Sequence, residues 1–291
     1  MTITPLKPET KTETAPKAVG IHKMIPNLIT LTALCAGLTA IQFSLDGHWD
    51  RAVIAIVVAA LMDALDGTFA RLLKATSDFG AQLDSLSDFL AFGIAPPLIL
   101  YTWVLEDAGK IGWIAMLVFS AAMAIRLARF NVTSLEKKPE WKKNFFSGVP
   151  APAGAGLALL PMFIWLQFPM AFDSISFANP LVGIWVIFVA GLMVSRIPTF
   201  STKQIKIPAK MAIPALGGAI LFIAALIQAP WETLTVSALA YFTSILFAIR
   251  HFRHLQRQHA DHEDLSDMAL GAMTLDDLTD DKDDAPKGKT S

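Results

Sequence analysis

Five aspartates fall within 26 residues of a chain that is otherwise strongly apolar. The stretch DALDGTFARLLKATSDFGAQLDSLSD occupies residues 63–88. Asp63 and Asp66 are three residues apart, and Asp84 and Asp88 are four apart. If both segments are helical, each spacing puts two carboxylates on one helix face. The stretch therefore predicts four carboxylates that converge from two neighbouring helices.

Four clustered carboxylates predict a divalent metal site. An aspartate in a membrane helix costs about 2.5–3.5 kcal/mol on insertion scales, and like charges close together add to that cost. Arg71 and Lys74 are the two cations of the stretch, and they cannot neutralise four carboxylates. Hard ions such as Mg²⁺ or Mn²⁺ prefer oxygen ligands, and two of them about 3.5–4 Å apart clamp a phosphoryl group. The alternative is that some aspartates only cap helices, as we expect for Asp78.

Small residues beside the aspartates indicate a ligand pocket. Gly67, Ala70 and Gly80 leave the helix backbone open to a bulky ligand. Arg71 follows Gly67 by one helical turn, where its guanidinium can bind a phosphate oxygen. Residue types and spacing thus favour chemistry on a phosphate-containing substrate.

The composition indicates that these helices lie in a membrane. The chain has 291 residues, of which 54% are hydrophobic and 17% charged, whereas soluble domains are about one quarter charged. Cys35 is the one cysteine, which excludes a disulfide framework. The first twenty residues are polar and lack the apolar core of a signal peptide, so we expect the first membrane helix to direct insertion.

Apolar windows long enough to cross about 30 Å of hydrocarbon recur along the chain. We therefore predict an all-α integral membrane protein, a bundle of about eight transmembrane helices. The windows are 24–45, 51–72, 79–104, 109–131, 149–171, 180–196, 209–228 and 231–250.

The charge distribution predicts the orientation and the limits of the domains. With eight spans, nineteen Lys and Arg residues fall on one side of the membrane and two on the other. By the positive-inside rule, both termini and the aspartates then lie at the cytoplasmic side of the cell membrane. The acidic end of the chain cannot form a packed core. The predicted regions are a cytoplasmic N-terminal segment at 1–23, a transmembrane catalytic domain at 24–252, and a disordered acidic cytoplasmic tail at 253–291.

The aspartate stretch resembles the signature of one known family. The pattern Asp63-x2-Asp66-Gly67-x2-Ala70-Arg71-x8-Gly80-x3-Asp84-x3-Asp88 is similar, at all eight fixed positions, to that of the CDP-alcohol phosphatidyltransferases. The resemblance implies a membrane-embedded, metal-dependent homodimer in contact with lipid and without a nucleic-acid partner. It would transfer a phosphatidyl group from CDP-diacylglycerol to an alcohol and release CMP.

The same resemblance implies a role for each position. Asp63, Asp66 and Asp84 would bind the metal, and Asp88 would both bind metal and take the proton of the acceptor hydroxyl. The residues that would line the CDP pocket are Gly67, Ala70, Arg71 and Gly80.

The acceptor alcohol is indicated by other segments. The fourth span ends AIRLARFNV, with Arg126 and Arg129 three residues apart and Asn131 just beyond. Paired guanidinium groups suit a serine carboxylate, and they suit glycerol phosphate or inositol phosphate as well. Arginines at a membrane interface also extend to water without binding a ligand. The residue types alone therefore leave the acceptor open.

Four segments resemble the phosphatidylserine synthase branch of the family. They are PNLIT, DSLSDFLAFGIAPPLILY, RLARFN and FSGVPAPA, which begin at residues 26, 84, 126 and 146. This resemblance implies L-serine as the acceptor, bound near Arg126, Arg129 and Asn131, and it adds Asn27 and Thr30 to the CDP site. Sister enzymes that use glycerol 3-phosphate, inositol phosphate or choline are the alternatives. A cation transporter built on the same aspartates is an alternative of another class.

Overall fold

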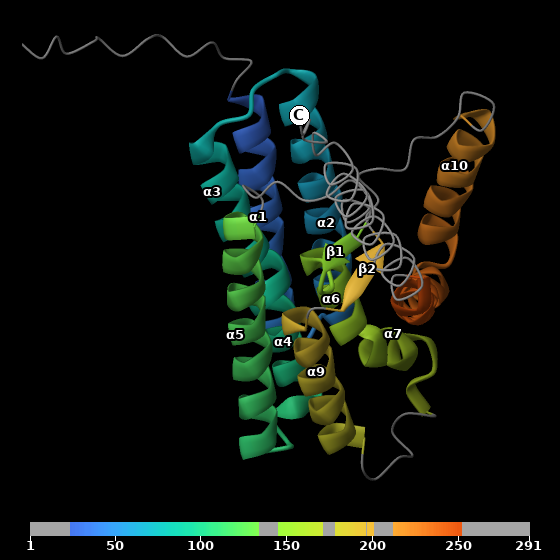
Figure 1. The fold of residues 1–291 in the computed structure, drawn as a ribbon. Helices are drawn as coiled ribbons and strands as arrows, with labels where there is room; N and C mark the ends of the chain where they lie inside the picture. The colour runs from blue at the N-terminus through green and yellow to red at the C-terminus, as the bar shows by residue number, and fades with distance from the viewer. Residues whose placement is uncertain (1–23, 134–144, 171–177, 196, 201–211, 252–291) are drawn as a thin grey trace, which may run out of the picture.

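A computed structural model describes residues 24–133, 145–170, 178–195, 197–200 and 212–251 (Figure 1). The predicted N-terminal segment at 1–23 and the predicted acidic tail at 253–291 lie outside these described residues. The described part of the predicted transmembrane domain is a bundle of helices with one short β-ribbon.

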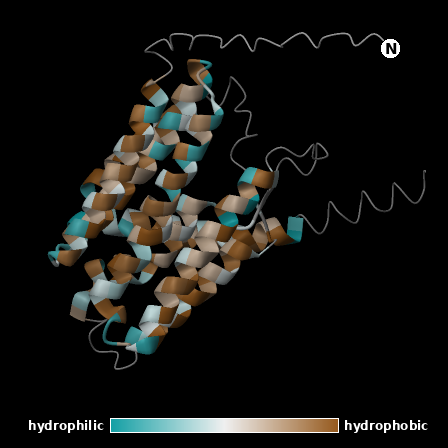
Figure 2. Ribbon diagram, turned by 90° about the vertical axis from the view of Figure 1, so that its left-hand side faces the viewer, coloured by the Kyte–Doolittle hydropathy of each residue, from teal (hydrophilic) through white to brown (hydrophobic). Residues whose placement is uncertain are grey.

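Five helices in the described ranges are long and apolar enough to cross a membrane. The ribbon in Figure 2, coloured by hydropathy, shows hydrophobic residues recurring along the helices. They coincide, within a few residues, with five of the predicted windows, so the all-helical membrane class is confirmed. These helices are α1 Ile25–Leu45, α2 Trp49–Leu72, the continuous helix Asp78–Leu105, α5 Lys110–Thr133 and Pro230–His251.

The other three predicted windows correspond to shorter helices. Window 180–196 is α9 Ala178–Val194, and window 209–228 is α10 Ala212–Gln228. Window 149–171 is divided into α6 Ala151–Ala158 and α7 Leu160–Gln167, with Leu159 between them.

The division between α6 and α7 has a chemical cause. Pro161 has no N–H group, so it cannot donate to the Leu157 carbonyl one turn earlier. The indole Nε1 of Trp185, in α9, donates to that carbonyl instead at 2.8 Å. The proline thus ends a regular helix that hydropathy alone predicts to continue, and the freed carbonyl joins α6 to α9.

The helix that carries Asp84 and Asp88 changes its winding along its length. It consists of α3 Asp78–Asp88, the π-helical η2 Phe89–Ile94, α4 Ala95–Leu100 and the π-helical η3 Tyr101–Leu105. Pro97 cannot donate to the Gly93 carbonyl, which accepts a hydrogen bond from Ser120 Oγ of α5 at 2.9 Å. Short π-helical turns often occur at functional sites, and here η2 begins directly after Asp88.

Small residues allow the helices around this segment to approach closely. A Cβ at Gly37 of α1 would lie 2.8 Å from the Ala91 Cα of η2. A Cβ at Gly93 would lie 2.7 Å from Met123 Cγ of α5. Any larger residue at either position would push the helices apart. The helix that carries Asp84 and Asp88 is therefore held tightly between α1 and α5.

A short β-ribbon, which the sequence did not predict, closes the bundle beside α9. Strands β1 Phe145–Ser147 and β2 Pro198–Phe200 pair antiparallel, with Phe146 opposite Thr199. The helix α10 stands apart from the rest in Figure 1, and most of its described side chains are exposed. The firmly packed part of the molecule is thus α1 to α9, with the Pro230–His251 helix against it.

Candidate active site

The aspartates are positioned by a tight connection between two helices. Asp63 and Asp66 lie in the last third of α2, and Asp84 and Asp88 lie in α3. The connector is residues 73–77, and Lys74 in it has a φ of +50°. Ser77 caps α3 by accepting a hydrogen bond from the Gly80 N–H at 3.0 Å. Asp78 is exposed in the first turn of α3, so its predicted role as the cap was wrong.

Three of the four predicted carboxylates form one group. Oxygen atoms of Asp63, Asp66 and Asp84 all lie within 4.8 Å of one another. Asp66 is 5% exposed, and the other two are half-buried. Three convergent carboxylate oxygens are a donor set that suits a hard divalent cation. The residues present therefore fit a Mg²⁺ or Mn²⁺ ion.

Asp88 lies beside this group and connects it to α5. Its carboxyl shares a hydrogen bond with Asp63 and interacts electrostatically with Asp84. It also interacts with the guanidinium of Arg126. Asp88 thus stands between the three clustered carboxylates on one side and a cation on the other.

The first helix holds Asp66 in place. Thr30 Oγ1 donates to Asp66 Oδ2 at 2.6 Å, and it also lies 3.0 Å from the Pro26 carbonyl of its own helix. Ser87 Oγ of α3 donates to the Thr30 carbonyl at 3.0 Å. Thr30 is 4% exposed. One residue of α1 therefore fixes α1 to both aspartate-bearing helices.

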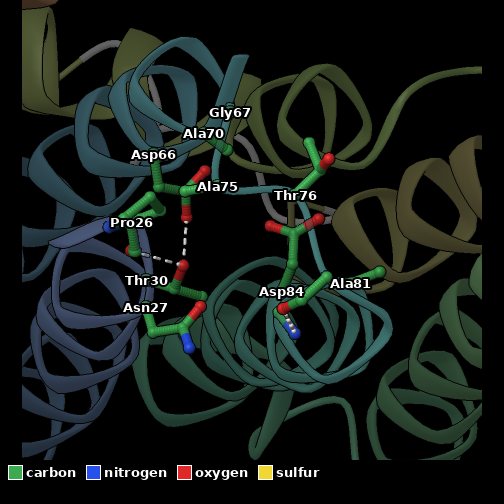
Figure 3. Close-up of a pocket in the computed structure, with 12 residues that line it drawn as sticks. Pro26, Asn27, Thr30, Asp66, Gly67, Ala70, Ala75, Thr76, Ala81 and Asp84 are labelled. Atoms are coloured by element: carbon green, nitrogen blue, oxygen red, sulfur yellow. Dashed lines mark hydrogen bonds between the residues drawn. The ribbon is translucent and has the colours of Figure 1, made fainter. Parts of the chain in front are cut away.

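A pocket opens directly beside the clustered carboxylates (Figure 3). It is a cavity of about 160 Å³ between α1, α2, α3 and their connector, with Asp66 and Asp84 in its wall. Five of the predicted CDP-site residues line it, namely Asn27, Thr30, Gly67, Ala70 and Gly80. The residues that the sequence reading missed are Pro26, Ala75, Thr76, Ser77 and Ala81. The polar ones, Thr76 and Ser77, belong to the short connector between α2 and α3. A polar connector between the two aspartate-bearing helices is the sequence signal that could have predicted them.

Two of the predicted pocket residues have distinct surroundings. A Cβ at Gly80 would lie 3.0 Å from Asn27 Oδ1 and 3.2 Å from Ser77 Oγ, so this position has no room for a larger side chain. Arg71 is exposed, and its guanidinium donates to Thr68 Oγ1 at 3.4 Å. It lies over Gly67 at the margin of the pocket rather than in its wall.

The three residues predicted to bind the acceptor alcohol have different partners in the structure. Arg126 interacts electrostatically with Asp88 and Asp63. Arg129 donates to the carbonyls of Val194 at 2.7 Å, Ser195 at 3.2 Å and Met193 at 3.4 Å, so it caps the C-terminal end of α9. Asn131 Nδ2 donates to Ser85 Oγ at 3.0 Å and thereby ties α5 to α3.

Gly148, inside the FSGVPAPA segment, belongs to the same structural junction. Its φ of +82° is in the region that favours glycine. A Cβ there would lie 2.5 Å from the Met193 carbonyl oxygen and 3.2 Å from Arg129 Nη2. Its own carbonyl accepts a hydrogen bond from the buried Thr199 of β2 at 2.8 Å. The segment therefore seats the β-ribbon on the end of α9 that Arg129 caps.

Apolar membrane-length helices around a carboxylate cluster and a small polar pocket define an integral membrane protein with a divalent-cation site. The family model named CDP-alcohol phosphatidyltransferase matches residues 23–194, and a second one, CDP-alcohol phosphatidyltransferase 2, matches residues 210–245. The chain belongs to the CDP-alcohol phosphatidyltransferase family. This membership sets aside the hypothesis of a cation transporter.

Similar curated proteins cover most of the chain. A CDP-diacylglycerol–serine O-phosphatidyltransferase of Mycobacterium leprae is 35% identical over 240 residues, which are 82% of this chain and 78% of that protein. A protein of the same name from Mycobacterium tuberculosis H37Rv is 34% identical over 80% of each chain. One from Helicobacter pylori 26695 is 32% identical over 73% of this chain and 85% of the relative.

Proposed function

We propose that the protein transfers the phosphatidyl group of CDP-diacylglycerol to L-serine and so forms phosphatidylserine and CMP. The relatives carry the name of this activity over most of the chain. The observation that carries the proposal is the position of Asp88, between the clustered carboxylates and Arg126. In this position Asp88 can take a proton, with the metal-binding carboxylates on one side of it and a cation that can bind the serine carboxylate on the other.

Asp63, Asp66 and Asp84 would hold a divalent cation, Mg²⁺ or Mn²⁺, and Asp88 would complete a second position. When bound, the cations neutralise the phosphate charges that develop during transfer. Thr30 orients Asp66 for this role by its 2.6 Å hydrogen bond. Such supporting hydrogen bonds fix the direction of a ligand oxygen.

The pocket beside Asp66 and Asp84 is our proposed CDP site. Asn27 and the connector hydroxyls offer polar contacts, and Gly67, Ala70 and Gly80 leave room for the nucleotide against the helix backbone. Arg71, at the margin of the pocket, is placed to bind a phosphate oxygen from the solvent side. The diacyl tails of the donor would remain in lipid.

Asp88 is our proposed general base. The serine hydroxyl oxygen forms the new bond to the phosphatidyl phosphorus, and its proton passes to an Asp88 oxygen. The bond from that phosphorus to the bridging oxygen breaks, and CMP leaves with the bridging oxygen and the electron pair. Arg126 would bind the serine carboxylate, because it is the predicted acceptor residue that lies beside Asp88. Arg129 and Asn131 would support this pocket by holding α9 and α3 against α5.

The charge asymmetry supports a cytoplasmic active site with both termini on the same side of the cell membrane. The aspartates lie where α2 ends and α3 begins, at the end of the bundle where that rule places the cytoplasm. We also propose that the protein forms a homodimer, on the basis of its resemblance to the family.

The test is CMP release by the purified protein in detergent with CDP-diacylglycerol and Mn²⁺ or Mg²⁺. L-Serine, glycerol 3-phosphate, inositol phosphate and choline are supplied one at a time, with Asp88→Asn beside the wild type. We expect release with serine and its loss in the variant. Release with another acceptor only would overturn the serine assignment, and full activity of Asp88→Asn would overturn the base.

A further inference from the structure

Two buried polar atoms on the acceptor side of the site have no hydrogen-bond partner within the part of the chain that the structure describes. They are Arg126 Nη1 of α5 and Tyr241 Oη of the Pro230–His251 helix. The two groups interact electrostatically with each other, so they lie in one region. A third such atom, Thr235 Oγ1, lies almost two turns earlier on the helix of Tyr241. Buried polar groups without a partner are rare, and each one requires an explanation.

The surroundings of Tyr241 leave its hydroxyl available. Its ring lines an apolar cavity of about 370 Å³, together with Ala60 of α2 and Phe92 of η2. Its hydroxyl lies beside Thr199 of β2. Thr199 donates its own proton to the Gly148 carbonyl at 2.8 Å, so it does not donate to Tyr241. The ring of Tyr241 packs against the hydrophobic core, and its hydroxyl has no hydrogen-bond partner among the described residues.

The surroundings of Arg126 point to a ligand with a single negative charge. Arg129, the nearby guanidinium, is committed to three carbonyls of α9 and its end. The charge of Arg126 already faces Asp88. Its free Nη1 atom and the neutral phenol of Tyr241 can therefore satisfy two acceptor oxygens that share a single charge. A carboxylate has this form, whereas a phosphate dianion requires more cationic compensation.

We propose that the Tyr241 hydroxyl binds the carboxylate of the acceptor amino acid together with Arg126. The bound acceptor then lies next to Asp88, which interacts with Asp84 in the wall of the pocket between α1, α2 and α3. Tyr241 is therefore a specificity residue that selects acceptors with a carboxylate. This inference rests on the proposed transfer to serine.

The test is the Tyr241→Phe variant, which keeps the ring and its packing and removes only the hydroxyl. The matched control is Tyr101→Phe, because Tyr101 is the second of the two tyrosines in the sequence. Tyr101 contacts Trp113 edge to face, with ring centroids 5.5 Å apart, near the far end of the Asp78–Leu105 helix. Serine and ethanolamine serve as acceptors, since ethanolamine carries the hydroxyl and amine without the carboxylate.

We expect Tyr241→Phe to raise the KM for serine about tenfold, as the loss of one hydrogen bond to a charged group predicts. The KM for CDP-diacylglycerol, the kcat at saturating serine and the activity with ethanolamine should stay at the wild-type values. Tyr101→Phe should match the wild type in every measurement.

Three results would overturn the inference while the wild type uses serine. They are an unchanged KM for serine, an equal loss with serine and ethanolamine, and an equal rise in the KM of both substrates. If the wild type releases no CMP with serine, the proposed function fails first and the inference fails with it. The wild-type measurement therefore separates the two failures.

Discussion

The two regions that flank the clustered carboxylates differ in how their polar groups are satisfied. On the side of α1 and α2, Thr30 donates to Asp66, and Ser77 accepts from Gly80, so the key polar groups already have protein partners. On the side of α5 and the Pro230–His251 helix, Arg126 Nη1 and Tyr241 Oη are buried without a hydrogen-bond partner among the described residues. The first side is organised by the protein's own hydrogen bonds, whereas in our proposal the ligand supplies the missing partners of the second side. Asp88 lies between them and interacts with both.

The largest effect should come from the carboxylate cluster of the organised side. Asp84→Asn removes one charged ligand oxygen from a group that lies within 4.8 Å. We expect CMP release to fall on the order of 10³-fold, as for other losses of transition-state charge stabilisation. Mn²⁺ binding, followed by electron paramagnetic resonance, should weaken in parallel.

Asp78→Asn is the matched control for this change, because Asp78 is an exposed aspartate in the first turn of the same helix. It should keep both the activity and the Mn²⁺ binding of the wild type. Normal Mn²⁺ binding by Asp84→Asn would contradict the metal assignment.

The next effect should be specific to the acceptor side. Arg126→Gln removes the cation next to Asp88 and should raise the KM for serine roughly 10- to 150-fold, since a hydrogen bond to a charged group contributes about 1.5–3 kcal/mol. The KM for CDP-diacylglycerol should change little. Steady-state kinetics with each substrate varied in turn measure both values. A rise confined to the CDP-diacylglycerol KM would contradict the role of Arg126 in binding serine.

A smaller effect on metal affinity should follow from removing the hydrogen bond that orients Asp66. Thr30→Val keeps the shape of the side chain and removes the 2.6 Å hydrogen bond to Asp66. The affinity for Mn²⁺ should fall about tenfold, as expected for the loss of a group that orients a metal ligand. Thr32→Val is the control, because Thr32 Oγ1 donates only to the Leu28 carbonyl of its own helix and is exposed. Equal Mn²⁺ affinities of the two variants would show that Thr30 does not orient Asp66.

The smallest kinetic effect should come from Arg129, despite its closeness to Arg126 in the sequence. Arg129→Gln removes hydrogen bonds to three carbonyls at the end of α9. We expect a loss of about 1–3 kcal/mol in stability, seen as a lower Tm in detergent, with the KM for serine close to the wild-type value. A large rise in that KM with an unchanged Tm would make Arg129 an acceptor ligand after all.

The convergence of the carboxylates could be predicted from the sequence because it depends on local spacing. The spacings of Asp63 with Asp66 and of Asp84 with Asp88 fix one helix face each, and a connector of five residues forces the two helices together. Thr30 was expected to contact CDP, but its hydrogen bond to Asp66 depends on how α1 packs.

The other side could not be predicted in the same way because it depends on contacts between distant segments. Arg126 and Arg129 look equivalent in the sequence, and only the position of α9 separates their surroundings. Tyr241 reaches the site from a helix near the end of the described chain, and no local spacing connects it with Asp88. The β-ribbon joins strands of three residues each that are also far apart in the sequence.

The central claim, that a nucleotide side and an acceptor side flank the carboxylates as separate regions, is tested most directly by combining Gly80→Ala with Arg126→Gln. A Cβ at position 80 would crowd Asn27 Oδ1 at 3.0 Å on the nucleotide side. Gly156→Ala is its control, because a Cβ there meets no atom within 4 Å. One two-substrate titration of the single and double variants gives every KM. We predict that Gly80→Ala raises only the KM for CDP-diacylglycerol, that Arg126→Gln raises only the KM for serine, and that the double variant shows both changes independently. If either single variant raises both KM values by the same factor, the two sides are one site and the account is wrong.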